Sequence, residues 1–109
     1  MQIDIEQHEG GVVLTPNGEI DLSSSPELRE SLLAALRDNP SKLIVNLSKT
    51  PYMDSSGVAT LVEAMQKAMR SKTKLVLCGM EEKVRSIFEI ARLDAVFTIV
   101  DDTNAAQLV

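Results

Sequence analysis

The stretch LIVNLSKTPYMDSSGVATLVEAMQKAMR, residues 43–70, joins a short apolar run to a loop and then to a long helix-like pattern. Leu43-Ile44-Val45 is continuously apolar, which is typical of a strand that is covered on both faces. From Ser55 to Arg70 the apolar residues recur at helical spacing, at positions 58, 61, 62, 65 and 69. A buried strand followed by an amphipathic helix indicates one unit of an α/β fold.

The same alternation between strand-like and helix-like periods continues on both sides of this stretch. A helix is expected to open at Ser24-Ser25-Pro26-Glu27, because Ser is a preferred N-cap and Pro fits the first turn. Asn39-Pro40 should end that helix. Downstream, the pattern predicts a strand over 75–78, a helix over 82–93, a strand over 96–100 and a short terminal helix capped at Asp101-Asp102-Thr103.

The first residues indicate a hairpin. Ile3 and Ile5 alternate with polar residues, the segment His8-Glu9-Gly10-Gly11 is typical of a turn, and Val12-Val13-Leu14 follows as a second strand. Pro16 cannot donate to a sheet ladder, so the second strand should end there or leave its N–H side unpaired.

The resulting element order is β-β-α-β-α-β-α-β-α. It predicts an α/β fold in one domain over residues 1–109, with a mixed, mostly parallel sheet of about five strands and about four helices. If consecutive strands are neighbours, all crossover helices lie on one face of the sheet, and the other face is only partly covered.

Composition excludes several classes of function. The charge sum is 11 − 16 = −5, so binding to nucleic acid or to anionic lipid is not expected. The longest apolar run, Leu32 to Leu36, is five residues, whereas a membrane helix needs about 20, so we expect no direct membrane insertion. A single cysteine, Cys78, and a start without signal-peptide character favour a cytoplasmic location.

Catalytic and metal-binding constellations are not found in the sequence. His8 is the only histidine and lies in the predicted hairpin turn, so no nucleophile–base pair is expected. One His and one Cys do not make a zinc site. Cys78 lies in an apolar strand and is interpreted as a small buried hydrophobe. We therefore expect no enzymatic activity, no metal and no cofactor.

The loop Tyr52-Met53-Asp54-Ser55-Ser56-Gly57 carries the main functional signal. Asp54 is placed to cap the following helix, and Gly57 offers no side chain to crowd the loop or an approaching partner. One interpretation is a plain helix start. The other is a serine hydroxyl at the solvent-facing, positive end of a helix, where a phosphate would add roughly −1.5 to −2 charge beside Asp54. Met53 is expected to expose a soft apolar contact.

With these segments in this order, the chain resembles the STAS domain family, the sulfate-transporter and anti-sigma-factor-antagonist group. The resemblance covers nearly the whole chain and is carried by Gly18-Glu19-Ile20-Asp21, Pro26-Glu27-Leu28, Leu43 to Leu47, Tyr52 to Gly57, and Val84 to Leu93 with Phe97. One departure is Ala91-Arg92-Leu93, where many members have Thr-Gly-Leu, which alters the helix C-cap.

The resemblance implies a function. In the stand-alone bacterial antagonists, the serine after the signature aspartate is the phosphoacceptor, which here is Ser55. Asp21, Met53, Asp54, Ser56 and Gly57 would form the partner-binding switch loop. The unphosphorylated protein would bind an anti-sigma factor that is a serine kinase and so free a sigma factor, and a serine phosphatase would reverse the modification.

A second branch of the family implies a different role. Some small STAS proteins are accessory subunits of ABC transporters that move lipids, and they bind the ATPase subunit without phosphorylation. The segment from Gly57 to Glu63 is compatible with that branch too.

Overall fold

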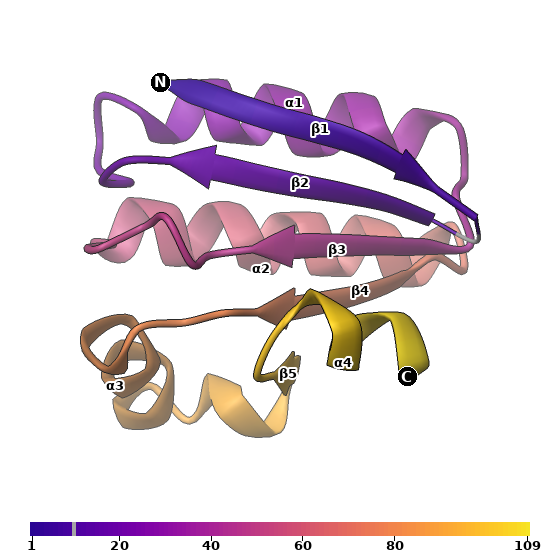
Figure 1. Ribbon diagram of the computed structural model, residues 1–109. Coiled ribbons are helices and arrows are strands. Elements are labelled where there is room, and N and C mark those ends of the chain that lie inside the picture. The colour runs from indigo at the N-terminus through magenta and orange to yellow at the C-terminus, as the bar shows by residue number, and fades with distance from the viewer. Residues whose placement is uncertain (10) are drawn as a thin grey trace.

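A five-stranded sheet with the order β1-β2-β3-β4-β5 runs through the computed structural model, which describes residues 1–9 and 11–109 (Figure 1). The first two strands pair antiparallel, and every later neighbour pairs parallel. This confirms the predicted fold class. The strands are β1 (Gln2–His8), β2 (Gly11–Asn17), β3 (Lys42–Asn46), β4 (Lys74–Cys78) and β5 (Thr98–Val100).

The helices cover the two faces of the sheet unequally. Helices α1 (Ser25–Arg37) and α2 (Ser55–Arg70) lie side by side behind the sheet in Figure 1, whereas α4 (Thr103–Leu108) crosses its front. Buried side chains of α1, α2 and α3 (Glu82–Ile90) share one large core cluster with the sheet. On the other face, Ala106 of α4 completes a smaller cluster, so that face is covered only in part, as expected.

The second strand is longer than its apolar run. It begins at Gly11 and continues through Pro16 to Asn17. Pairing with β3 stops at Leu14, so Pro16 lies beyond that ladder and pairs only with Ile3 of β1. A proline is tolerated there because its missing N–H interrupts no pairing with β3. The turn predicted over His8–Gly11 includes Gly10, which lies outside the described residues.

The third helix is shorter than predicted. It ends at Ile90 rather than Leu93, because Arg92 adopts a left-handed backbone with φ of 60°. A short 3-10 turn, η1 (Leu93–Ala95), follows, so β5 begins at Thr98 rather than Val96. Within the described residues, no helix is both long and apolar enough to cross a membrane.

Candidate functional site

Two loops are joined backbone to backbone at the carboxyl ends of β2 and β3. Ile20 pairs with Met53 in an isolated parallel bridge. The N–H of Ile20 donates to the carbonyl of Tyr52 at 3.0 Å, and the N–H of Asp54 donates to the carbonyl of Ile20 at 3.0 Å. This bridge sets the Asp21 loop beside the start of α2. Both segments, the one around Ile20 and the one around Met53, stand out in the sequence, but nothing in the sequence indicates that they pair with each other.

Asp54 caps α2, as predicted. Its Oδ1 accepts hydrogen bonds from the N–H of Ser56 at 2.9 Å and the N–H of Gly57 at 3.4 Å, and from the hydroxyl of Ser56 at 2.5 Å. These bonds lower the pKa of the Asp54 carboxyl, the Ser56 hydroxyl most strongly, while the negative charge of Asp21 acts in the opposite direction. Asp54 therefore stays ionised and fixes Ser56.

Ser55 and Ser56 are adjacent in sequence but differ in environment. Ser55 is the first residue of α2 and is exposed. Within the described residues its hydroxyl makes no hydrogen bond, whereas the Ser56 hydroxyl is half-buried and donates to Asp54. Ser55 is thus the serine of this loop whose hydroxyl is open to an approaching reagent or enzyme.

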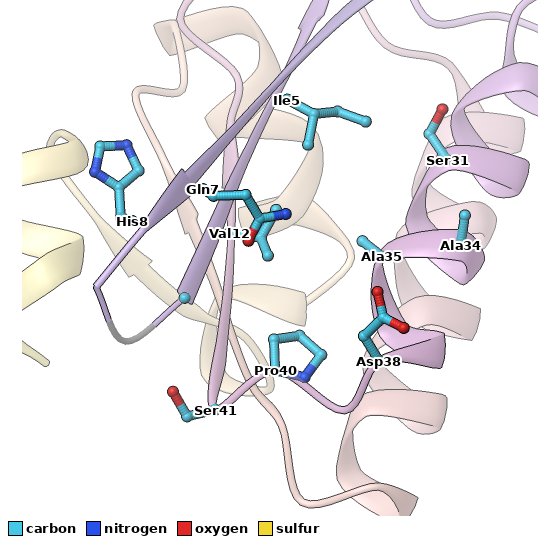
Figure 2. Close-up of a pocket in the computed structure, with 11 residues that line it drawn as sticks. Ile5, Gln7, His8, Val12, Ser31, Ala34, Ala35, Asp38, Pro40 and Ser41 are labelled. Atoms are coloured by element: carbon cyan, nitrogen blue, oxygen red, sulfur yellow. The ribbon is translucent and has the colours of Figure 1, made fainter.

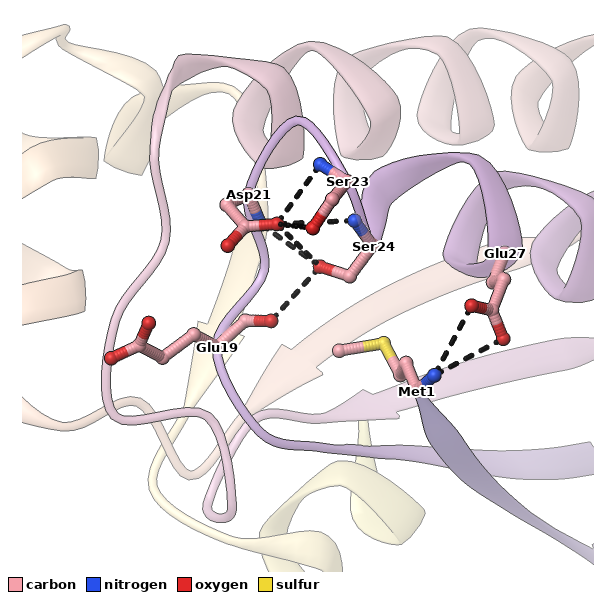
Figure 3. Close-up of polar contacts among 6 residues, drawn as sticks. All are labelled: Met1, Glu19, Asp21, Ser23, Ser24 and Glu27. Carbon is pink, nitrogen blue, oxygen red and sulfur yellow. Dashed lines mark hydrogen bonds and ion pairs between the residues drawn. The ribbon is translucent and has the colours of Figure 1, made fainter.

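Asp21 organises the neighbouring loop (Figure 3). Its Oδ1 accepts from the N–H groups of Ser23 and Ser24 at 3.0 and 3.1 Å and from the Ser23 hydroxyl at 2.8 Å. The Ser23 hydroxyl contributes most to lowering the pKa of Asp21. The charge of Asp21 is therefore permanent at neutral pH and lies close to that of Asp54.

Ser24 does not cap α1 with its side chain, contrary to the prediction. Its backbone is already near the helical region, with φ of −101° and ψ of −21°, so its hydroxyl turns away from the first turn of α1. The hydroxyl accepts from the N–H of Asp21 at 2.9 Å and donates to the carbonyl of Glu19 at 2.9 Å (Figure 3). Ser24 closes the Asp21 loop instead.

The expectations for Met53 and Gly57 need correction. Met53 is 0% exposed, so it offers no apolar contact to a partner. Gly57 is buried rather than open to an approaching molecule, and a Cβ there would lie 2.5 Å from Cγ of Met53 and 2.7 Å from Cγ2 of Ile20. Both residues support the loop from beneath because the bridge between Ile20 and Met53 draws this segment into the core.

An apolar groove of ≈ 580 Å³ lies next to Ser55, between the start of α2 and α3. It is lined by Ser55 together with Tyr52, Asp54, Val58, Ala59, Ile87 and Ala91, and the fully buried Met53 lies beneath them. The sequence does not reveal this groove, because the helical period places Ile87 and Ala91 on the same face as Val84 and Phe88 and so predicts that all four are buried. In the structure Ile87 is half-buried and Ala91 exposed, and α3 buries only Val84 and Phe88.

Other reactive groups lie away from this site. His8 ends β1, opposite Gly11 at the beginning of β2, whereas Ser55 follows the carboxyl end of β3, so the two lie at opposite ends of the sheet. Cys78 is fully buried, and desolvation raises the pKa of its thiol to about 11. No metal-binding cluster of His, Cys, Asp or Glu occurs in the part of the chain that the structure describes.

Sheet order, helix placement and the capped loop after β3 together define a STAS fold. A model of the STAS domain matches residues 2–106, and the chain belongs to the STAS domain family. An anti-sigma-B factor antagonist of Staphylococcus aureus (strain NCTC 8325 / PS 47) is 29% identical over 87 residues, which make up 80% of this chain and 81% of that protein.

Solved structures agree on the fold. The crystal structure of an anti-sigma factor antagonist from Mycobacterium paratuberculosis aligns with a TM-score of 0.91 at 23% identity, covering 98% of this chain and 91% of that chain. The phosphorylated form of the Bacillus cell fate determinant SpoIIAA aligns with a TM-score of 0.74 at 20% identity, covering 97% of each chain.

Proposed function

We propose that this protein is an anti-sigma factor antagonist controlled by phosphorylation of Ser55. In this role it is a single-domain binding protein (residues 1–109) that, when unphosphorylated, binds an anti-sigma factor with serine-kinase activity and so releases a sigma factor. The observation that carries the proposal is the unengaged hydroxyl of Ser55 at the exposed start of α2, beside a Ser56 hydroxyl that is held by Asp54.

The docking surface in this proposal is the groove beside Ser55. Tyr52 is 46% exposed at its edge, and Leu22, 78% exposed, stands in the adjoining Asp21 loop. A partner that covers these apolar groups removes them from water, which favours binding. Ser55 lies in the same groove wall, so a docked kinase has the hydroxyl within its contact surface.

Phosphorylation would oppose that docking through charge. A phosphate on Ser55 adds roughly −1.5 to −2 charge where Asp54 and Asp21 are already ionised. Covering this site with a partner then requires a concentrated negative charge to leave water, which is unfavourable unless the partner supplies matching cations. A serine phosphatase restores the binding form by removing the charge.

Asp54 selects the serine in this proposal. Because its Oδ1 holds both the N–H and the hydroxyl of Ser56, that hydroxyl is not free to enter a kinase active site. Asp21 holds the adjoining loop in place, and Met53 and Gly57 support both loops from the core. The switch loop therefore has one modifiable hydroxyl on a rigid base.

A kinase assay in which the phosphorylated residue is identified tests the proposal. The full chain is incubated with ATP and the serine-kinase anti-sigma factor from the same genome, and phosphate is located by mass spectrometry. We expect modification at Ser55, loss of modification with retained binding in Ser55→Ala, and unchanged modification of Ser55 in the matched variant Ser56→Ala. Phosphate on Ser56, or equal labelling of Ser55→Ala, would contradict the assignment.

The same protein samples also test the alternative role, that of an accessory subunit of an ABC transporter. Stable binding to the ATPase subunit of a lipid-transport ABC system, with no binding to the kinase and no modification of Ser55, would replace the proposal by the accessory-subunit function.

A further inference from the structure

We propose a second binding surface, independent of the Ser55 site: the outer edge of β1 accepts an extended peptide segment in which basic residues alternate with apolar ones. The segment adds to the sheet as a further strand beside β1. Its apolar side chains enter a groove between β1 and α1, and its basic side chains meet the acidic residues on the opposite face of β1. Strand addition of this kind combines backbone hydrogen bonds with side-chain pockets.

The groove has a volume of ≈ 520 Å³, and its lining combines apolar side chains with the polar groups of Gln7, Ser31 and Asp38 (Figure 2). Ile5 and Val12 extend from the hairpin toward α1, where Ala34 and Ala35 face them. Because alanine side chains are short, α1 leaves the space over β1 unfilled, and Ile5 remains 51% exposed. An apolar side chain placed over Ile5 would bury surface that the chain itself leaves in water.

The backbone of β1 offers hydrogen bonds at the same residues. In an antiparallel pair, opposed residues alternate between hydrogen-bonded and non-bonded pairs. Pro16, which has no N–H, lies opposite Ile3, so Ile3, Ile5 and Gln7 are placed in the non-bonded pairs and turn their N–H and C=O groups outward. β1 is the first strand of the sheet, and no other strand of the described residues pairs with that outer edge.

Charge specifies the occupant. Side chains alternate across a strand, so Asp4 and Glu6 lie on the face opposite to Ile5. Acidic residues on an edge strand disfavour pairing with a second copy, because antiparallel pairing of β1 with itself centred on Ile5 would set Asp4 against Glu6. A strand with lysine or arginine at every second position instead places opposite charges side by side, on a chain whose net charge is −5.

The surface lies away from the switch loop. Pro40 and Ser41, which precede β3, border the groove, whereas Ser55 follows the opposite end of β3. A peptide on β1 therefore leaves the Ser55 groove open, and the two surfaces can be occupied together. The failure of either proposal leaves the other intact.

Binding of a synthetic peptide to the isotopically labelled full chain tests this inference by NMR. The probe is a short capped peptide in which lysine alternates with valine. We expect saturable binding with shifts along β1 and around Ala34, and slowed hydrogen exchange at the amides of Ile3, Ile5 and Gln7. A peptide of the same composition with all lysines before the valines should bind weakly and give no such protection.

Matched charge variants separate this site from general attraction to an acidic protein. Asp4→Lys combined with Glu6→Lys should weaken binding about ten-fold, because two attractive contacts become repulsive. Glu81→Lys combined with Glu89→Lys, two exposed positions at α3, makes the same change in net charge and should bind like the unaltered chain.

Three results would overturn the proposal. The first is that both pairs of charge substitutions weaken peptide binding equally. The second is that the peptide changes chemical shifts only in elements other than β1 and α1. The third is that the peptide binds but does not slow hydrogen exchange at the outward amides of β1, which would indicate that it occupies the groove as a helix. Ile5→Pro gives a further check, because it removes an outward N–H while leaving the pairing of β1 with β2 possible. If the Ile5→Pro variant has a native NMR spectrum and still binds the peptide as strongly as the unaltered chain, that result would also count against strand addition.

Discussion

Gly57 packs directly on Met53, so closely that a Cβ at position 57 would lie 2.5 Å from Cγ of Met53. Met53 is itself fully buried and is paired through its backbone with Ile20. The start of α2 therefore rests on a contact that only glycine permits without movement of the methionine. This contact determines how closely the first turn of α2, with its cap Asp54 and its first residue Ser55, packs on the core.

Gly57→Ala should destabilise the protein by about 1–2 kcal/mol, because overpacking against Met53 outweighs the better helix propensity of alanine. Urea unfolding measures the loss. In a Met53→Ala background, which by itself should cost about 2–5 kcal/mol, the shortened side chain removes the overlap with Met53 and leaves only the one with Cγ2 of Ile20, 2.7 Å from the added methyl group. Gly57→Ala should then be less harmful than in the unaltered chain but not neutral, and strictly additive effects would show that residues 53 and 57 do not compete for space.

Asp54→Asn should make the free energy of unfolding depend less on pH in the acid range. The pKa of the Asp54 carboxyl is lower in the folded chain than the ordinary aspartate value of 3.8, first because the Ser56 hydroxyl donates to it. A depressed folded pKa contributes stability that is present above the unfolded pKa and is lost as the pH falls through the folded value. Urea midpoints of the unaltered chain should therefore fall further than those of Asp54→Asn between neutral pH and pH values below 3.8.

Ser56→Ala gives an intermediate case for the same measurement. It removes the hydroxyl bond to Asp54 but keeps the backbone bonds from residues 56 and 57. Its acid dependence should lie between those of the unaltered chain and Asp54→Asn. An unchanged profile in both variants would mean that Asp54 does not contribute through ionisation.

Ser55→Asp should change the free energy of unfolding by no more than about 0.5 kcal/mol, because Ser55 is exposed and its hydroxyl holds nothing in place. Ser56→Asp should be clearly more destabilising, since it removes the hydroxyl donor and sets a second carboxylate against Asp54. Thermal unfolding of the two variants makes the comparison. A large loss for Ser55→Asp would show that this serine is structural.

Periodicity predicted the fold because burial follows it in α1 and in the central strands, although in α2 only Leu61 of the five periodic apolar residues is buried and Met69 is 70% exposed. Leu28, Leu32 and Leu36 of α1 all lie in the core, and the apolar runs in β3 and β4 are covered on both faces. Periodicity did not predict where a helix ends when the backbone conformation of a single residue determines that end. The pattern continued α3 to Leu93, but Arg92 takes a left-handed conformation, and no hydrophobic pattern records a value of φ.

The candidate site could be predicted only in part, for the same reason. The capping role of Asp54 follows from residue type and position, and the exposure of Ser55 follows from its place in the first turn. The burial of Met53 depends on a bridge to Ile20, thirty-three positions earlier in the sequence. The groove beside Ser55 depends on how far α3 stands from α2, which neither segment specifies alone.

Cys78 should be inert to thiol reagents in the folded protein. Its side chain is fully buried, and burial, with a smaller effect of the Asp102 charge, raises the pKa of the thiol to about 11. The reactive thiolate is therefore a trace species at neutral pH. Labelling with a maleimide should be slow without urea and fast with it, and Ser55→Cys should add one rapidly labelled site. Rapid labelling of Cys78 in the native chain would contradict its burial.

Arg92→Gly should stabilise the protein by about 1 kcal/mol. Arg92 has φ of 60° and ψ of 24°, a left-handed conformation that costs a residue with a Cβ roughly 1–2 kcal/mol and costs glycine little, although glycine loses more backbone entropy on folding. The residue is exposed, so few contacts are lost with its side chain. Arg85→Gly is the matched control, because Arg85 lies inside α3 and the same replacement there should destabilise by about 1 kcal/mol. Opposite signs in urea unfolding would establish that backbone conformation ends α3, whereas destabilisation by both variants would mean that the Arg92 side chain contributes contacts that outweigh its strained backbone.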